Sequence, residues 1–291
     1  MDFQFNFSLG DFNRTDLETH DCREESSDQR SLPASEEILP EPQLCPEFLE
    51  SEYEVLKLGK NIAINCLRSR SVEGRLGGLN DDNCIQKTMA NHSDLIPNVY
   101  EGGLKVWECS LDLVQYLKEA RVPLEGLHIL DLGCGAGLPG IFALQQNAAQ
   151  VCFQDFNKEV LNYLTIPNVR LNIGDRDISE TCQFISGDWG QIGDDLIASN
   201  RFDVILTSET IYNTDSVPSL YTLMKRTLKP EGMILVAAKT HYFGVGGGTR
   251  LFEEYIQKQL DFRIEVCKKI TEGVQREILQ MKYKEKKVSD G

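Results

Sequence analysis

Residues 128–142, HILDLGCGAGLPGIF, combine a short apolar run with a dense set of glycines. The glycines stand at positions 133, 135, 137 and 140, and apolar residues at a helix-like density follow them. This order predicts a strand, a tight turn and a helix. Such a turn presents bare backbone N–H groups at a helix N-terminus, where no side chain blocks a nucleotide. We therefore expect a nucleotide-binding turn here.

Two registers of this turn suit different cofactors. Gly135, Gly137 and Gly140 form a G-x-G-x-x-G pattern, and Asp155 follows 20 residues after Gly135, which is typical of dinucleotide-binding enzymes. Asp131 instead begins a D-x-G-x-G-x-G pattern, which resembles motif I of seven-strand methyltransferases that bind S-adenosylmethionine (SAM). Asp155 suits either cofactor, because ribose hydroxyl groups are bound by carboxylate acceptors.

Polar residues follow each further strand-like run of the chain. They are Asp155, the pair Asp188-Trp189, residues 208–213 and residues 239–248. In open α/β sheets, ligands bind outside the carboxyl ends of the strands, so these groups are expected to meet at one cleft. The Asp188-Trp189 pair suits the adenine side of SAM and, with the terminal hairpin described next, favours SAM over NAD.

The elements that must position these residues alternate between strands and helices. Strands are predicted at 128–132, 151–155, 182–186, 202–207 and 233–238, and helices at 104–120, 158–171 (broken by Pro167), 216–228 and 250–259. Two last strands, 262–270 and 276–283, are joined by a turn too short for a crossover helix, so they must pair antiparallel. This pattern predicts a doubly wound, Rossmann-like α/β sheet of seven strands with an antiparallel C-terminal hairpin.

The N-terminal region divides into two parts. Residues 1–52 form an acidic leader that we expect to be largely disordered, although its FQFNF start alternates like an extended strand. Residues 53–291 form one domain, with N-terminal strands and a loop in 53–103 and the catalytic core in 104–291. Strands are expected within 53–66 and at 84–90, separated by a loop that contains Gly74, Gly77, Gly78 and residues 80–83.

Charge and cysteine usage exclude several classes of protein. The net charge is −15, and residues 1–56 contribute −12 of it with 15 acidic and 3 basic side chains. The rest is close to neutral and offers no basic surface for nucleic acid, so no direct nucleic-acid binding is expected. Nine cysteines contain no C-x-x-C pair, which indicates reduced thiols and no metal site. We expect neither a signal peptide nor a membrane span.

Four segments resemble the histidine protein methyltransferase 1 homolog family: EGGLKVWECSLDL, LDLGCGAGLPGI, LTSETIYN and KTHYFGVGGG. The resemblance covers roughly residues 53–291 and the FQFNF start, and HYFGVGGG is its most specific part. It implies transfer of a methyl group from SAM, with S-adenosylhomocysteine as product, to the tele nitrogen of a histidine in a large-subunit ribosomal protein. It further implies a monomer in the cytoplasm and the nucleus or nucleolus. The segment 172–181 is shorter and more acidic than in the family members, which weakens the case for a built-in nuclear signal.

The resemblance and the glycine motif together name the candidate site. Expected SAM contacts are Val106, Trp107, Glu108, Cys109, Ser110, Asp131, Gly133, Gly135, Gly137, Gln154, Asp155, Phe156, Gly187, Asp188, Trp189 and Ser208. The catalytic candidates are Glu209, Tyr212 and Asn213. Glu209 or Asn213 would accept the pros N–H of an imidazole and leave the tele lone pair facing the methyl group, and Tyr212 completes an acid-x-x-aromatic pattern.

Three other functions stay open on the sequence. They are a SAM-dependent lysine methyltransferase, a non-catalytic SAM-fold factor of ribosome assembly, and an NAD dehydrogenase. His241 is a weak candidate for a general base, because a single histidine beside Tyr and Phe is more often a structural hydrogen-bonding group. Residues 244–248 are a poor candidate for a phosphate-binding loop, because no Lys-Ser/Thr pair follows them, and we expect a flexible strap over the substrate peptide.

Overall fold

A computed structural model describes residues 34–40, 49–59, 61–76, 99–174 and 176–285. The FQFNF start, the candidate strand 84–90 and the loop residues 77–83 lie outside the described residues.

The described residues form a mixed sheet of eight strands in the order β1-β6-β5-β4-β7-β8-β10-β9. Strands β6, β5, β4, β7 and β8 run parallel, whereas β10 pairs antiparallel with both β8 and β9. The strand bounds are β1 Glu36–Glu37, β4 His128–Leu132, β5 Gln150–Asp155, β6 Cys182–Ser186, β7 Phe202–Ser208, β8 Leu228–Lys239, β9 Phe262–Ile270 and β10 Arg276–Tyr283. The predicted Rossmann-like sheet and its C-terminal hairpin are confirmed.

Strand β1 is an addition to the seven expected strands. Glu36 and Glu37 pair antiparallel with Ser186 and Ile185 of β6, and the Ile38 N–H donates to Phe184 O at 2.8 Å. This part of the leader is therefore ordered on the sheet edge. The edge of β6 presents unpaired backbone groups to any extended segment, which the acidic composition of the leader does not reveal.

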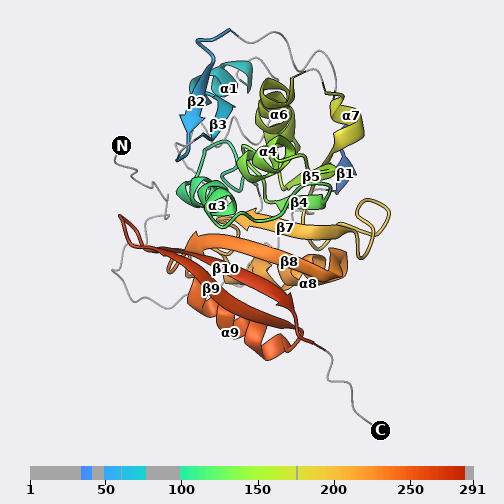
Figure 1. Ribbon diagram of the computed structural model, residues 1–291, viewed down its shortest axis with the longest axis vertical. Helices are drawn as coiled ribbons and strands as arrows, with labels where there is room; N and C mark the ends of the chain where they lie inside the picture. The colour runs from blue at the N-terminus through green and yellow to red at the C-terminus, as the bar shows by residue number, and fades with distance from the viewer. Residues whose placement is uncertain (1–33, 41–48, 60, 77–98, 175, 286–291) are drawn as a thin grey trace, which may run out of the picture.

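Helices cover both faces of the sheet. Figure 1 shows α3 (Glu108–Glu119), α4 (Leu138–Gln145) and α6 (Ile166–Ile173) on one side, with α8 (Val217–Thr227) and α9 (Thr249–Gln259) on the other. Because successive side chains of a strand point to opposite faces, each strand supplies both cores. In β4, Ile129 packs with the α3 and α4 side, whereas Leu130 and Leu132 pack with the α8 side.

The segment 158–173 changes its helical form along its length. It consists of α5 (Lys158–Val160), a π-helical turn η2 (Leu161–Thr165) and α6. Pro167 stands in the first turn of α6, where the absence of its N–H costs least. The predicted break at Pro167 is wrong, because the segment stays helical through Pro167 and only its hydrogen-bonding pattern changes, in the π-helical turn before it.

A small N-terminal unit packs on α6. It contains β2 (Tyr53–Lys57) and β3 (Ala63–Leu67), which correspond to the strands expected within 53–66 and pair antiparallel with each other, and α1 (Ser69–Leu76). The Leu67 N–H donates to Asn168 Oδ1 at 2.8 Å, which attaches β3 to α6. Gly74 lies inside α1, so its assignment to a loop was wrong. Its neighbours Val72 and Leu76 are buried, and this packing outweighs the weak helix preference of glycine.

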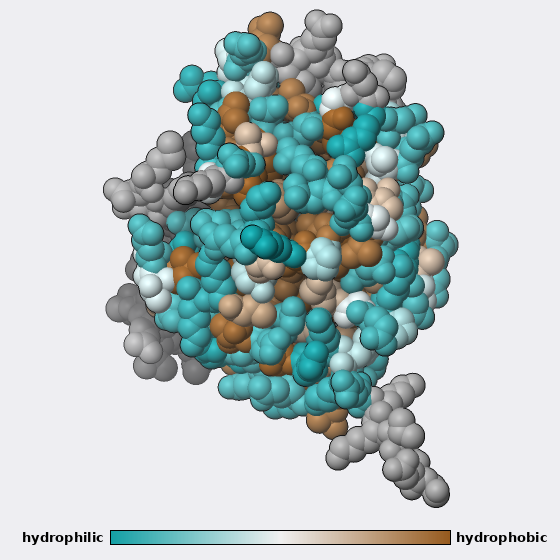
Figure 2. All heavy atoms as spheres, in the orientation of Figure 1, coloured by the Kyte–Doolittle hydropathy of each residue, from teal (hydrophilic) through white to brown (hydrophobic). Residues whose placement is uncertain are grey.

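The molecular surface is largely hydrophilic on the face seen in Figure 2, with hydrophobic side chains interspersed. In the described ranges, every helix is too short or too polar to cross a lipid bilayer.

Candidate active site

A cavity of about 390 Å³ opens at the carboxyl ends of β4, β5, β7 and β8. This is where the strand ends were expected to meet. Of the predicted site residues, it is lined by Val106, Trp107, Ser110, Gly133, Gly135, Asp155, Phe156, Asp188, Trp189, Ser208, Glu209, Tyr212 and Asn213. The tertiary structure thus brings together residues that are spread over more than 100 positions of the chain.

The glycine turn between β4 and α4 lies tightly against two neighbouring loops. Gly133 and Gly135 have φ angles of +65° and +50°, in the left-handed region that favours glycine. A Cβ atom on Gly135 would lie 3.1 Å from Gly103 O, and one on Gly133 would lie 2.5 Å from the Thr210 methyl group. Any side chain at these positions would displace a loop or fill the cavity. The turn therefore leaves its backbone open to a ligand.

Asp131 lies beneath this turn and does not line the cavity. Its carboxylate accepts the Gly140 N–H at 2.8 Å, and burial raises the pKa of Asp131 to about 8. Gly137 also lies away from the cavity, where its N–H donates to Cys134 O and it precedes α4. Both residues were predicted as SAM contacts, but the structure makes them supports of the turn.

Gln154 and Gly187 lie behind the residues that line the cavity and support them. The Gln154 side chain donates to Gly187 O at 2.9 Å and accepts the indole N–H of Trp189 at 2.8 Å. A Cβ atom on Gly187 would lie 2.6 Å from Ser35 Cα, so this glycine admits the passing leader. Both residues were predicted to contact SAM, but neither lines the cavity. Gln154 instead positions Trp189, which lines the cavity.

Glu108 and Cys109 also do not line the cavity. Residues 108–110 begin α3, where successive side chains point in different directions around the helix, so they cannot all face the cavity. Cys109 is buried, and burial raises the pKa of its thiol. The Glu108 carboxylate lies 3.5 Å from Nη1 of Arg276 on β10. Only Val106, Trp107 and Ser110 of this predicted group line the cavity.

The half of the cavity near β5 and β6 suits the adenosine part of SAM. Asp155 ends β5, and its carboxylate accepts the N–H groups of Gly135 at 2.9 Å and Asn157 at 3.2 Å. Burial raises the pKa of Asp155 to about 6. Its free acceptor positions suit a ribose diol, and the aromatic rings of Phe156 and Trp189 nearby suit a purine. The donors and acceptors present therefore fit the cofactor.

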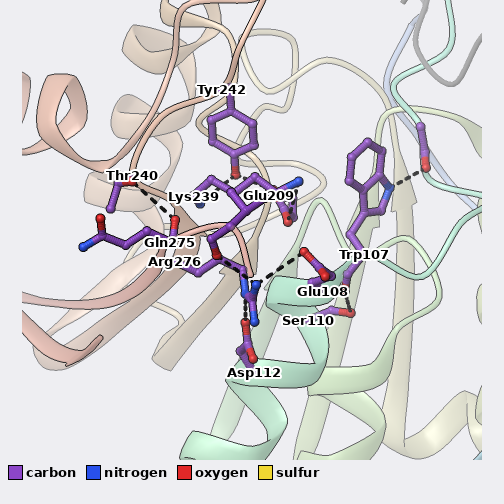
Figure 3. A network of polar contacts seen from close by, with 12 residues as sticks. Trp107, Glu108, Ser110, Asp112, Glu209, Lys239, Thr240, Tyr242, Gln275 and Arg276 are labelled. Carbon is purple, nitrogen blue, oxygen red and sulfur yellow. Dashed lines mark hydrogen bonds and ion pairs between the residues drawn. The ribbon is translucent and has the colours of Figure 1, made fainter. Parts of the chain in front are cut away.

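The half near β7 and β8 contains a buried ionic cluster around Glu209. Glu209 has a φ of +59°, and its N–H donates to Ala237 O at 3.0 Å. Its carboxylate accepts the Tyr242 hydroxyl and lies 3.6 Å from Lys239 Nζ, with both charged side chains only 6% exposed. Figure 3 shows the three side chains converging. A strained backbone that turns a carboxylate inward is typical of functional positions.

One oxygen of Glu209, Oε1, is in an ion pair with Lys239. Oε1 is buried and, within the described part of the chain, makes no hydrogen bond. Buried polar atoms normally have a partner. Oε1 therefore suits a donor that a bound molecule would supply.

Tyr212 and Asn213 lie on the segment that follows Glu209. The Tyr212 hydroxyl donates to the Glu101 carboxylate, and burial together with this carboxylate raises the pKa of Tyr212. Asn213 Oδ1 accepts the Asp215 N–H at 3.0 Å, which caps the turn before α8. Asn213 lines the cavity, but its acceptor oxygen is engaged, so Glu209 is the better placed of the two predicted acceptors.

The glycine-rich strap is attached to this segment by backbone hydrogen bonds. Gly247 N–H donates to Tyr212 O at 2.9 Å, and Gly248 N–H donates to Ile211 O at 3.1 Å. A Cβ atom on Gly247 would lie 2.2 Å from Ile211 O, so the close approach requires glycine. The segment was expected to be a flexible strap, but these backbone hydrogen bonds attach its end to residues 211–212. His241 packs edge-to-face on Phe243 at the cavity.

Several residues that line the cavity had no individual role on sequence grounds, and three of them carry the polar contacts described above. They are Glu101, Lys239 and Tyr242. The only sequence feature that could have indicated Lys239 is its position as a charged residue directly after the apolar, buried run of β8. Its pairing with Glu209 depends on contacts between two strands that are 30 residues apart, which no local pattern records.

The fold and the cavity define a SAM-dependent methyltransferase. In agreement, a family model described as "Lysine methyltransferase" matches residues 97–258.

More specific relatives span most of the chain. The histidine protein methyltransferase 1 homolog of Rattus norvegicus is 36% identical over 276 residues, covering 87% of this chain and 75% of that protein. The Bos taurus homolog is 40% identical over 268 residues, covering 84% and 71%. The Dictyostelium discoideum homolog is 44% identical over 198 residues, covering 67% and 62%.

The chain belongs to the histidine protein methyltransferase 1 homolog family. It is an enzyme, and its cofactor is SAM. The alternatives of an NAD dehydrogenase and of a non-catalytic binding protein are therefore set aside.

Proposed function

We propose that this methyltransferase modifies the tele nitrogen of a histidine in a large-subunit ribosomal protein. The observation that carries the histidine assignment is the buried Glu209 Oε1, which forms an ion pair with Lys239 at 3.6 Å but makes no hydrogen bond within the described residues. It supports an acceptor with a neutral N–H donor, which imidazole has. The names of the relatives agree with this acceptor.

The cofactor would occupy the half of the cavity between the glycine turn and β6. Asp155 would hold the ribose hydroxyl groups, and Phe156, Asp188 and Trp189 would hold the adenine. When bound, SAM supplies an electrophilic methyl group. The enclosing side chains would fix the approach of the acceptor, and positioning of this kind contributes roughly 7–11 kcal/mol in favourable cases.

Glu209 would orient the acceptor ring. Its Oε1 would accept the pros N–H of the imidazole, which leaves the lone pair of the tele nitrogen directed toward the methyl group. A neutral imidazole is already a nucleophile near its unperturbed pKa of about 6.5, so no strong base is required. As positive charge develops on the ring, the Glu209 carboxylate would stabilise it.

A basic ribosomal protein agrees with the charge of the enzyme. The chain carries a net charge of −15, and charges of opposite sign accelerate the encounter of two proteins. The resemblance of HYFGVGGG and its neighbouring motifs to the family supports the same substrate class.

A lysine acceptor is the second candidate, because the matching family model is described as "Lysine methyltransferase". A lysine side chain must lose a proton before it attacks a methyl group. Within the described residues, the carboxylate best placed to hold an ammonium group, Glu209, is already paired with Lys239. This pairing favours histidine.

Amino-acid analysis of the labelled product tests the proposal. Purified large-subunit ribosomal proteins are incubated with the enzyme and methyl-labelled SAM, hydrolysed and separated. We expect the label in tele-methylhistidine. Label in methyl-lysine would overturn the proposal, and a reaction with the Gly135→Arg variant provides the background.

A further inference from the structure

The acceptor end of the cavity contains a cation of its own. Lys239 Nζ lies 3.6 Å from Glu209 Oε1, and it stands over the rings of Trp107 at 5.4 Å and Tyr242 at 5.6 Å. Aromatic faces and a carboxylate are together a strong environment for an ammonium group. An acceptor lysine would require such a place, and Lys239 occupies it.

Charged groups on neighbouring elements maintain this arrangement. Arg276 of β10 lies opposite Lys239 of β8, and α3 supplies Asp112 and Glu108 to its guanidinium. The positive charge of Arg276 is thus neutralised by the carboxylates of α3, and that of Lys239 by Glu209. The other titratable groups that face the cluster are Cys109, Tyr212, His241, Tyr242 and Glu101.

We propose that Lys239 is a specificity-determining residue that excludes an ammonium acceptor and admits a neutral imidazole. This inference rests on the proposed function and deepens it. An acceptor ammonium that approached Glu209 would meet a second cation within a few ångströms in a buried place. A neutral ring N–H meets no such repulsion, and a carboxylate retains acceptor positions beyond those used by Tyr242 and Lys239.

Lys239 also disfavours the protonated form of the acceptor. An imidazolium ring has no lone pair at the tele nitrogen and cannot react. A nearby cation lowers the pKa of a bound imidazole, so the bound acceptor stays neutral at lower pH than a free one. Specificity built from a repulsive element is common where two ligands carry similar groups.

The test compares binding and pH dependence of matched peptides. The wild-type enzyme first identifies its acceptor peptide from the labelled product. That peptide and its counterpart with lysine at the acceptor position are then titrated by fluorescence anisotropy with S-adenosylhomocysteine present. Lys239→Met is compared with the wild type, and Lys229→Met is the matched control. Lys229 lies on the same strand, outside the cavity, in a partly exposed pair with Asp203.

We expect Lys239→Met to bind the lysine peptide at least about tenfold more tightly, because like charges this close repel by more than that factor. The acidic limb of its kcat profile moves to higher pH, because Glu209 then stabilises the imidazolium. Lys229→Met retains the wild-type peptide preference and pH profile.

A second variant separates charge from cavity creation. In Glu209→Gln combined with Lys239→Gln both charges are absent, so the lysine peptide gains no affinity over the wild type. The inference is overturned if Lys239→Met weakens both peptides equally with an unshifted pH profile, or if the double variant gains as much affinity for the lysine peptide as Lys239→Met does. A wild-type enzyme that labels lysine would overturn the proposed function itself, which is a separate result.

Discussion

Arg276 of β10 lies directly opposite Lys239 of β8, and its Nε donates to the Asp112 carboxylate of α3 at 2.5 Å. Figure 3 shows this bond beneath the Glu209 cluster. Two cations on neighbouring strands would repel each other, but each has its own carboxylate. The helix that borders the cavity is thereby attached to the C-terminal hairpin.

Removal of the Asp112 carboxylate is expected to destabilise the fold. Asp112→Ala leaves a largely buried guanidinium without its main partner, which costs about 1–3 kcal/mol of unfolding free energy. Urea denaturation measures it. Glu119→Ala is the matched control, because Glu119 joins the same helix to Lys268 of the same hairpin through a more exposed pair. Such pairs contribute about 0–1 kcal/mol. Equal losses in both variants would contradict the structural role of the buried pair.

Gly135→Arg is expected to abolish SAM binding in titration calorimetry. The backbone φ of +50° strains any other residue, and the added side chain would meet Gly103 or enter the cavity. Gly74→Arg is the control, since Gly74 lies on an exposed turn of α1 with open space around it. Unchanged SAM affinity of the Gly135 variant would show that the turn is not the cofactor site.

Tyr212→Phe is expected to lower kcat/KM for the protein substrate without lowering the affinity for SAM. It removes the hydroxyl group bound to Glu101, and hydrogen bonds to charged groups contribute about 1.5–3 kcal/mol. We expect kcat/KM for the protein substrate to fall by about tenfold or more. Tyr221→Phe removes the same kind of bond, to Asp261, outside the cavity. It should retain wild-type kinetics; an equal kinetic loss there would point to a general effect on folding.

Stability should fall as pH rises because of Asp131. Burial raises its folded pKa to about 8, whereas an unfolded aspartate has a pKa of about 3.9. Between these values the folded state binds more protons than the unfolded chain, so this carboxyl group stabilises the fold at low pH and loses that effect toward pH 8. Asp155, with a pKa of about 6, acts in the same direction at lower pH.

Asp131→Asn should flatten this decline. Its amide oxygen still accepts the Gly140 N–H, but it does not ionise. Between pH 6 and 8.5, urea denaturation should show the wild type losing on the order of 2 kcal/mol relative to the variant. Parallel pH profiles would contradict the assignment. Because the carboxylate lies outside the cavity, the SAM affinity of the variant should stay within about threefold of the wild type.

Local patterns predicted most of the fold. The bounds of β6, β9 and β10 match the predicted runs residue for residue, because branched and apolar residues recur along each run and turn residues bound it. Pattern could not reveal β1, since the pairing of two acidic residues with a sheet edge depends on the edge. Gly74 was misassigned for a related reason: packing on neighbouring elements, which the local sequence does not record, keeps it helical.

The sequence predicted which loops and strand ends surround the candidate site more accurately than which individual residues line it. Asp131, Gly137, Gln154 and Gly187 lie behind the cavity wall, and Glu108 and Cys109 lie on other sides of α3. A motif identifies which residues belong to a turn or strand end. It does not say which of them faces inward, because that depends on the orientation of the whole element.

The sequence by itself determined the alternating sheet, the glycine turn and the strand ends that carry the polar residues. These follow from periodicity and from backbone requirements that are local in the chain. Only the tertiary structure decided that Lys239, Tyr242 and Glu209 form one buried cluster, with Arg276 held apart by Asp112. The physical reason is that a charge can be buried only beside its partner, and those partners come from strands and a helix distant in sequence.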